Sequence, residues 1–208
     1  LSVQSQGILV RFGVRTVIDL RTSFEMSRQP NVFKNSTSVT FYHHNMIGDV
    51  PINSTDDVGS GIAFTSRIPV MYKEFLDHRK DQIKDILVTL SGSDALPAMY
   101  HCSAGQDRTG IISAIILGNA GVPYDTIAED YALTARYLID RYFQGYSDPG
   151  QTPENYTWKQ YQAQYCPPEA MMEVLEYLDE YYGGIYGYMV NIGLSRDQIV
   201  WLRNAILE

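Results

Sequence analysis

One segment of the sequence combines the residue types that nucleophilic phosphate chemistry needs. Residues 101–110 read His-Cys-Ser-Ala-Gly-Gln-Asp-Arg-Thr-Gly. A cysteine thiolate is a good nucleophile. An arginine presents a planar fork of N–H donors that can hold two phosphate oxygens at once. Cys102 is therefore predicted to attack a phosphoryl group, and Arg108 is predicted to bind it.

The surroundings of this segment favour the same chemistry. Residues 96–101 before it favour a strand, and residues 109–119 after it are apolar on nearly every face, as in a buried helix. A loop at a helix N-terminus points its N–H groups at one place, and the helix dipole attracts an anion there. Gly105 allows the turn that such a loop needs. The predicted phosphate-binding residues are Ser103, Ala104, Gly105, Gln106, Asp107 and Arg108.

The same helix terminus bears on the nucleophile. Cysteines at helix N-termini are more acidic than free cysteine, so we expect Cys102 to be a thiolate at neutral pH. Thr109 is expected to donate its hydroxyl to this thiolate and to ease its departure in a second step. His101 is expected to fix the loop through its ring nitrogens. A lone cysteine before an apolar helix is more often a buried apolar residue, but Cys, Gly, Arg, Thr and Gly rarely coincide at these offsets.

A phosphate ester also needs a proton donor for its leaving oxygen. Asp107 is the favoured donor because it lies inside the loop; its alternative role is that of a structural acceptor for loop N–H groups. Asp49, Asp56 and Asp57 are the other candidates. They lie in a stretch of turn-forming residues that could approach the loop on closure.

Strand patterns alternate with helix patterns along the chain, which predicts an α/β fold. Strands are expected near residues 14–20, 39–46 and 96–101, and helices over 66–90, 109–119, 124–143, near 168–182 and after Ser195. Residues 47–65 are predicted to form a lid-like loop, and residues 144–168 a second loop. We therefore expect a single domain over residues 1–208, with a central sheet flanked by helices and a helical C-terminal part from about residue 123.

Three further side chains have structural interpretations. Arg21 and Glu25 are four residues apart and are expected to form an ion pair with each other. Cys166 precedes two prolines and is expected to be a loop thiol, with a resolving cysteine as the alternative.

The amino-acid composition limits which classes of partner and cofactor are expected. The 208 residues carry a net charge of −8, and no run of 18 or more apolar residues occurs. Neither a nucleic-acid partner nor a membrane span is therefore expected. The two cysteines show no metal-ligand spacing, so we expect no metal and no cofactor. Two cysteines also favour a reducing, cytoplasmic compartment, with secretion as the alternative.

The loop resembles the signature of the protein tyrosine phosphatase superfamily, and more closely that of bacterial and fungal tyrosine/serine phosphatases, which reads HCxAGKDRTG. Residues 16–25 resemble the TVIDLRxxxE stretch of that family, and residues 181–195 resemble its C-terminal part. The resemblance implies a cysteine-phosphatase-like α/β sandwich. It also implies hydrolysis of phosphotyrosine, with phosphoserine and phosphothreonine as further substrates, through a cysteinyl-phosphate intermediate with Asp107 as acid. The expected partner is a phosphorylated protein or a small phosphomonoester.

The sequence departs from this family at two places. Gln106 stands where the family has a lysine, which related loops associate with inositol phosphates. The loss of this positive charge, together with the acidic net charge of the chain, argues against phosphoinositides and inositol phosphates. They are kept as the alternative substrates, and a phosphate-binding module without turnover is a third hypothesis. The family also usually carries a segment ahead of the position of Leu1, which suggests a trimmed chain.

Overall fold

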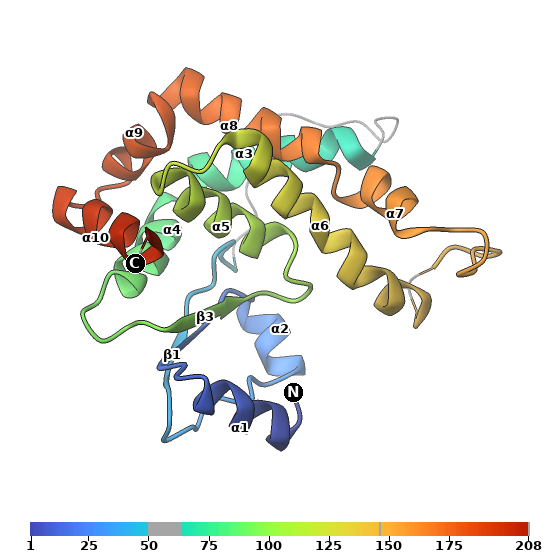
Figure 1. Cartoon of the computed structure of the whole chain (residues 1–208), viewed down its shortest axis with the longest axis horizontal. Helices are drawn as coiled ribbons and strands as arrows, with labels where there is room; N and C mark the ends of the chain where they lie inside the picture. Colours follow the sequence, from blue (N-terminus) through green and yellow to red (C-terminus); the bar gives the residue numbers. More distant parts are fainter. Residues whose placement is uncertain (50–63, 146, 208) are drawn as a thin grey trace.

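A small parallel sheet forms the base of the molecule. The computed structural model describes residues 1–49, 64–145 and 147–207 (Figure 1). Strands β1 (Thr16–Asp19), β2 (Thr40–His43) and β3 (Ala98–His101) lie in the order β2-β1-β3, and β1 is parallel to both neighbours. The carboxyl ends of the strands therefore meet at one edge, where the loop after His101 begins.

Helices cover both faces of this sheet. In Figure 1, α1 lies on one side of the sheet and the helices from α3 onward gather on the other. In chain order the helices are α1 (Val3–Arg11), α2 (Ser23–Arg28), α3 (Phe64–His78), α4 (Lys80–Leu90), α5 (Asp107–Asn119), α6 (Tyr124–Phe143), α7 (Trp158–Tyr165), α8 (Pro168–Tyr182), α9 (Gly184–Asn191) and α10 (Arg196–Leu207).

The two faces of β1 belong to two different cores. Val17 packs with Phe33 and Val39 in a small cluster that reaches α1. Ile18, on the opposite face, belongs to a large cluster that continues through the C-terminal helices. Successive side chains of a strand point to opposite faces, so a strand that is apolar at both positions is buried on both. All four residues of β1 are buried.

Helix α5 lies inside the large core and starts directly after the candidate loop. Its buried residues include Ile111 and Ile115, which share one face of the helix, and Ile112 and Ala114, which lie on either side of that face. Gly118 marks a close approach to α9, because a Cβ there would lie 2.0 Å from Ile185 Cδ1. The helix that carries the candidate phosphate site at its N-terminus is therefore held by packing on several sides.

Most expected elements are confirmed, and two regions need correction. The α/β fold, the three strands, and the helix Tyr124–Phe143 are present as predicted. The expectation of a loop over residues 144–168 is wrong, because α7 forms there; Thr157 and Gln160 make a capping box at its start. The short helix α2 was not expected either. The predicted lid-like loop falls mostly on residues 50–63, which lie outside the described residues.

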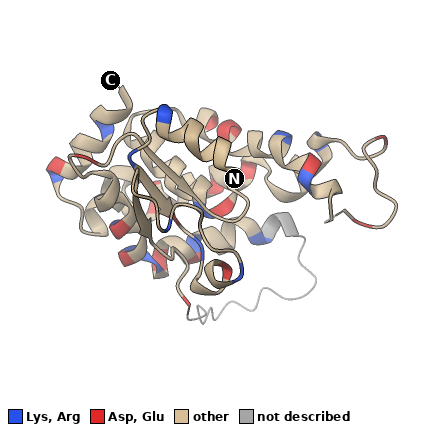
Figure 2. Ribbon diagram, turned by 90° about the horizontal axis from the view of Figure 1, so that it is seen from below, with Lys and Arg blue, Asp and Glu red and all other residues tan. Residues whose placement is uncertain are grey.

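Acidic and basic residues are scattered among one another in the view of Figure 2. Within the described ranges, no helix is long and apolar enough to cross a membrane.

Candidate active site

The segment from Cys102 to Arg108, here called the nucleophile loop, connects β3 to α5. Gly105 has a φ of +77°, a left-handed conformation that glycine adopts without strain. Its N–H donates to Cys102 Sγ over 3.2 Å. Cys102 is only 7% exposed, so its sulfur lies within the loop and faces a backbone donor.

Arg108 is held by Glu25, an acidic residue of α2, the helix that follows the neighbouring strand β1. Arg108 Nη1 and Nη2 donate to Glu25 Oε2 and Oε1 over 2.7 and 2.9 Å. Glu25 Oε2 also accepts the N–H of Thr22 over 2.8 Å, in the capping box that starts α2. The hydrogen bonds from Arg108 lower the pKa of Glu25 to about 2. A permanently charged Glu25 therefore fixes the orientation of the guanidinium.

The expected pairing of Arg21 with Glu25 is wrong. Arg21 precedes the N-cap of α2, so the two residues do not lie one helical turn apart. The Arg21 guanidinium turns back to Asp19, with Nη2 and Oδ2 separated by 2.7 Å.

A buried polar network supports the loop from the sheet; we call it the strand flank (Asp19, Arg21, Asn31 and His101). Asp19 is fully buried and accepts bonds from Arg21 and from Asn31 Nδ2, the latter over 2.8 Å. Burial raises the pKa of Asp19, but the hydrogen bonds from Arg21 and Asn31 outweigh this and lower it to about 2. The flank therefore contains a carboxylate, not a carboxylic acid, at neutral pH.

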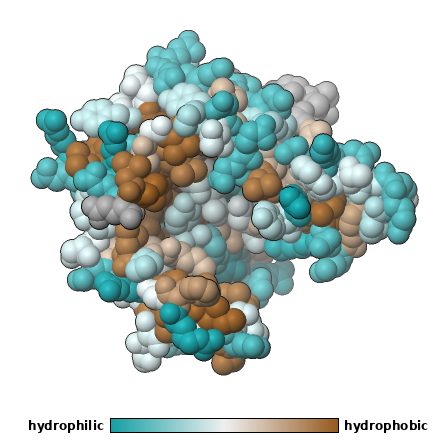
Figure 3. Space-filling view, viewed as in Figure 1, coloured by the Kyte–Doolittle hydropathy of each residue, from teal (hydrophilic) through white to brown (hydrophobic). Residues whose placement is uncertain are grey.

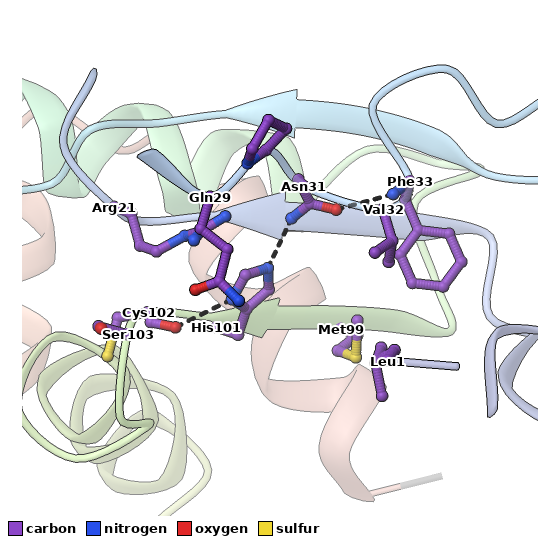
Figure 4. Close-up of a pocket in the computed structure, with 11 residues that line it drawn as sticks. Leu1, Arg21, Gln29, Asn31, Val32, Phe33, Met99, His101, Cys102 and Ser103 are labelled. Carbon is purple, nitrogen blue, oxygen red and sulfur yellow. Dashed lines mark hydrogen bonds between the residues drawn. The ribbon is translucent and has the colours of Figure 1, made fainter. Parts of the chain in front are cut away.

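The hydrogen bonds of Asn31 determine which ring nitrogen of His101 donates and which accepts. Asn31 Oδ1 accepts the N–H of Phe33, so its amide nitrogen faces His101 Nε2 over 2.8 Å (Figure 4). Because this amide can only donate, Nε2 must accept. Nδ1 then carries the proton and donates to the Cys102 carbonyl over 3.0 Å. His101 thus uses both ring nitrogens, one within the flank and one toward the loop.

A second network lies on the other side of the loop; we call it the helix flank (Tyr72, Tyr131, Gln106 and Asp107). The Tyr72 hydroxyl donates to Asp107 Oδ1 over 2.6 Å and lies 2.9 Å from the Tyr131 hydroxyl. Since Tyr72 uses its proton on Asp107, Tyr131 must donate to Tyr72. Burial, followed by the charge of Asp107, raises the pKa of Tyr72 well above its ordinary value. Sequence reasoning missed Tyr72, which no local pattern connects to Asp107.

The other proposed acids are placed differently. Asp49 accepts bonds from the Ser23 hydroxyl over 2.8 Å and from Asn45 Nδ2 over 2.8 Å, at the start of α2. The bond from Ser23 lowers the pKa of Asp49. Asp56 and Asp57 lie outside the described residues.

Thr109 differs from its expected role, whereas Cys166 lies in the short connection between α7 and α8, as expected for a loop thiol. Thr109 Oγ1 is buried and has no hydrogen-bond partner among the residues that the structure describes, so it does not donate to Cys102 Sγ here. Cys166 is fully buried between α7 and α8, and burial raises its pKa to about 12. A neutral, buried thiol does not suit a resolving cysteine. In the described part of the chain, no group of three or more His, Cys, Asp or Glu residues is placed to hold a metal ion.

Comparisons with known proteins agree on a family. The model of the tyrosine phosphatase family matches residues 1–208. A tyrosine-protein phosphatase of Nostoc commune is 28% identical over 204 residues, which cover 94% of this chain and 67% of that protein. The triple specificity protein phosphatase PtpB of Mycobacterium tuberculosis (strain ATCC 25618 / H37Rv) is 28% identical over 121 residues, or 53% of this chain and 44% of that protein. Because the family match runs from end to end, this chain belongs to the tyrosine phosphatase family and is a protein tyrosine phosphatase.

Proposed function

We propose that the chain hydrolyses phosphomonoesters of protein tyrosine, with phosphoserine and phosphothreonine as further substrates, through a phosphorylated Cys102. The observation that carries this proposal is the Arg108–Glu25 pair, with its two parallel hydrogen bonds of 2.7 and 2.9 Å beside a buried cysteine. A guanidinium held in this way is oriented before substrate arrives, and its remaining N–H donors can meet phosphate oxygens.

In the first step, the Cys102 thiolate attacks phosphorus and forms an S–P bond while the P–O bond to the leaving group breaks. Asp107 gives its proton to the departing oxygen. The backbone N–H groups of the loop and Arg108 stabilise the charge on the three equatorial oxygens. Oδ1 of Asp107 is bonded to Tyr72, which leaves the other carboxyl oxygen for the proton transfer.

In the second step, water attacks the same phosphorus. The Asp107 carboxylate takes a proton from that water, the S–P bond breaks, and the thiolate and inorganic phosphate are released. The N–H of Gly105, 3.2 Å from Sγ, stabilises the departing sulfur in place of the hydroxyl that Thr109 was expected to supply.

Asp107 is preferred over Asp49 as the acid for a geometric reason. The carboxylate of Asp49 already accepts hydrogen bonds from Ser23 and Asn45, which favour its charged form. A proton donor needs a carboxyl oxygen that can carry the proton toward the substrate. Both oxygens of Asp49 accept hydrogen bonds, whereas the bonds that Asp107 accepts from described residues end on Oδ1.

Trapping the intermediate tests the proposal. After rapid mixing with a phosphotyrosine peptide and acid quench, wild-type protein should carry one phosphoryl group on the peptide that contains Cys102. Cys102→Ser should lose turnover and the label but still bind inorganic phosphate in calorimetry. Cys166→Ala is the matched control and should be labelled like wild type. A Cys102→Ser variant with a tenth of the wild-type rate would refute covalent catalysis by this residue.

A further inference from the structure

A small pocket lies between α5 and α6, beside the nucleophile loop. Its volume is about 60 Å³, and Gly105 and Thr109 line it on the side of the loop. Asp130 lines it from α6. In Figure 1 the two helices lie next to each other, and Figure 3 shows hydrophilic residues among hydrophobic ones over this part of the molecule. We refer to this space as the interhelix pocket.

We propose that the interhelix pocket binds ordered water that hydrogen-bonds to both the Thr109 hydroxyl and the Asp130 carboxylate. This water connects α6 to the first turn of α5, which makes Asp130 a positioning residue for the nucleophile loop. The inference rests on the proposed function where it concerns phosphate binding, and the water site itself can be tested separately.

The hydroxyl of Thr109 needs a partner. Its Oγ1 atom is buried and has no hydrogen-bond partner within the part of the chain that the structure describes. Buried hydroxyls that lack a partner are rare in proteins, and ordered water is a common partner for such groups. Because Thr109 lines the interhelix pocket, water held there lies next to this side chain.

The helical period brings polar groups of both helices to the pocket. Thr109 and Ser113 are four residues apart on α5, so they share one face of that helix. Asp130 and Thr134 have the same spacing on α6. All four residues line the pocket. Hydroxyl and carboxylate groups from two helices thus supply the two to four polar partners that a buried water needs.

The arrangement of these groups leaves a place for water between Thr109 and Asp130. The Ser113 hydroxyl is already bonded to the Tyr100 hydroxyl over 2.8 Å. Asp130 is exposed, whereas Thr109 Oγ1 is buried, so the pocket leads from a carboxylate at the surface to a hydroxyl inside. Water at the inner end accepts from Thr109 and donates to Asp130, directly or through a second water.

The size and charge of the pocket favour water over other ligands. One water needs at least about 10–15 Å³ of such space, so the volume of about 60 Å³ has room for more than one. Sites for organic ligands are larger, at about 300–1,000 Å³. The Asp130 carboxylate opposes an anion. Among the described residues, no group of three or more His, Cys, Asp or Glu side chains is placed for a metal ion.

The pocket adjoins the groups that hold the nucleophile and the phosphate. Gly105, whose N–H donates to Cys102 Sγ over 3.2 Å, lines it together with Thr109. Thr109 directly follows Arg108 in the first turn of α5. Water that links this turn to α6 therefore limits how far the Gly105 N–H and the Arg108 guanidinium move from the geometry that binds phosphate.

A crystal structure of the wild-type protein with ordered solvent tests the water site directly. We expect water within about 3.2 Å of Thr109 Oγ1 that also bonds to an Asp130 oxygen, directly or through one further water. A pocket without ordered water, or a Thr109 hydroxyl that is bonded to another group, would overturn the inference.

Calorimetry with inorganic phosphate tests the positioning role. Asp130→Leu should weaken phosphate binding by about 3–10-fold, the range for one hydrogen bond. Asp130→Asn, whose amide oxygen still accepts from water, should restore binding to within about 2-fold of wild type. Glu129→Leu is the matched control, because it removes the neighbouring exposed carboxylate, which does not line the pocket, and it should bind phosphate like wild type.

A double-mutant cycle connects Asp130 to Thr109. Asp130→Leu should have no further effect on phosphate binding in Thr109→Val, because that variant no longer bonds to the water. The loss of charge at Asp130 is the same in both backgrounds and drops out of the comparison. Independent effects of the two changes would overturn the role of the water, as would equal losses in Asp130→Asn and Asp130→Leu or unchanged binding in Asp130→Leu.

Failure of the proposed function gives a different result. If wild type turns over no phosphomonoester, the function fails, and the water site is judged by the crystal structure and by the same cycle in urea unfolding. The losses of unfolding free energy in Thr109→Val and Asp130→Leu should then be smaller together than their sum. Additive losses would overturn the inference.

Discussion

The two flanks of the nucleophile loop use different chemistry to hold neighbouring residues. On the strand flank, a fully buried carboxylate is matched by a guanidinium and an amide, and the amide orients His101. On the helix flank, a chain of two tyrosine hydroxyls ends on Asp107. One flank is centred on a buried ion pair, and the other on neutral hydroxyl donors that face one carboxyl group.

This difference predicts different roles for the two flanks: the strand flank supports the loop, and the helix flank orients the proposed proton donor. Breaking a buried ion pair leaves a charge without compensation, so the strand flank contributes to stability and loop position. On the helix flank, the hydrogen bonds that Asp107 accepts from other described residues, from Tyr72 and at 3.5 Å from Gln106, end on Oδ1. Asp107 is therefore oriented by one oxygen and reactive through the other. Changes on the helix flank should alter rates, and changes on the strand flank should alter folding.

The largest expected effect is that of Asp107→Asn. An amide in this position can be oriented by Tyr72 but cannot give up a proton, so kcat should fall by ~10²–10⁴-fold. The loss should shrink for aryl phosphates with very acidic leaving groups, and the basic limb of the rate–pH profile should disappear.

Asp49→Asn is the comparison for this variant, because Asp49 lies at the start of α2. It should retain the wild-type profile. If instead Asp49→Asn loses the basic limb and Asp107→Asn keeps it, the helix flank does not supply the acid.

Asp19→Asn should be the most destabilising change on the strand flank. It replaces one buried acceptor oxygen by N–H donors that face Arg21 and Asn31, which should cost about 3–5 kcal/mol of unfolding free energy in urea melts. Rates per folded molecule should change less than in Asp107→Asn. Asp94→Asn, an exposed change, serves as control.

The pH dependence of the unfolding free energy provides a second test of the same variant. The pKa of Asp19 is lowered from 3.8 to about 2, so its contribution is complete above about pH 5 and is lost as the pH falls through 2. This contribution amounts to about 2 kcal/mol. The unfolding free energy of Asp19→Asn should therefore fall less between pH 4 and pH 2 than that of wild type. Equal slopes would show that Asp19 is not the charged centre of this flank.

The sequence revealed the loop but not the partners that hold it. The order of Cys102, Gly105 and Arg108 between a strand and a helix is a local pattern, and it is readable. Glu25 lies 83 positions from Arg108 and Tyr72 lies 35 from Asp107, so their pairing depends on how distant elements pack. For Arg21, a local pair was expected that does not form. A four-residue spacing predicts a pair only inside a helix, and α2 starts two residues after Arg21.

Helix α7 was missed for a different reason. Its mean hydropathy is low and only Tyr161 is buried among its residues. The sequence therefore lacks the apolar periodicity that predicts an amphipathic helix. The capping box of Thr157 and Gln160 was the available signal.

Tyr72→Phe should have a smaller, more specific effect on the helix flank. The change removes a donor that stabilises the charged form of Asp107, so the basic limb of the rate–pH profile should move to higher pH by up to about one unit. Tyr188→Phe also removes a buried hydroxyl that contacts α3, through the Leu76 carbonyl, without reaching Asp107. Both variants should lose similar stability, but only Tyr72→Phe should move the limb. A shift in both, or in neither, would argue against the hydroxyl chain.

The smallest expected effect is on substrate preference, at Gln106. From the sequence alone, a lysine at this position would be expected to favour inositol phosphates by adding a charge near the substrate. The structure places the Gln106 side chain elsewhere: Gln106 is 7% exposed, and its amide reaches the Tyr165 carbonyl. A lysine that follows this path ends beside Asp107 Oδ1, 3.5 Å from the present amide nitrogen, where the two charges compensate each other. Pairing with Lys also favours the charged form of the acid. Gln106→Lys should therefore lower kcat for phosphotyrosine peptide and inositol phosphate by a similar factor, with their ratio within about 3-fold of wild type, a difference below 1 kcal/mol. A ratio that moves tenfold toward inositol phosphate would mean that the lysine leaves the helix flank and reaches the substrate.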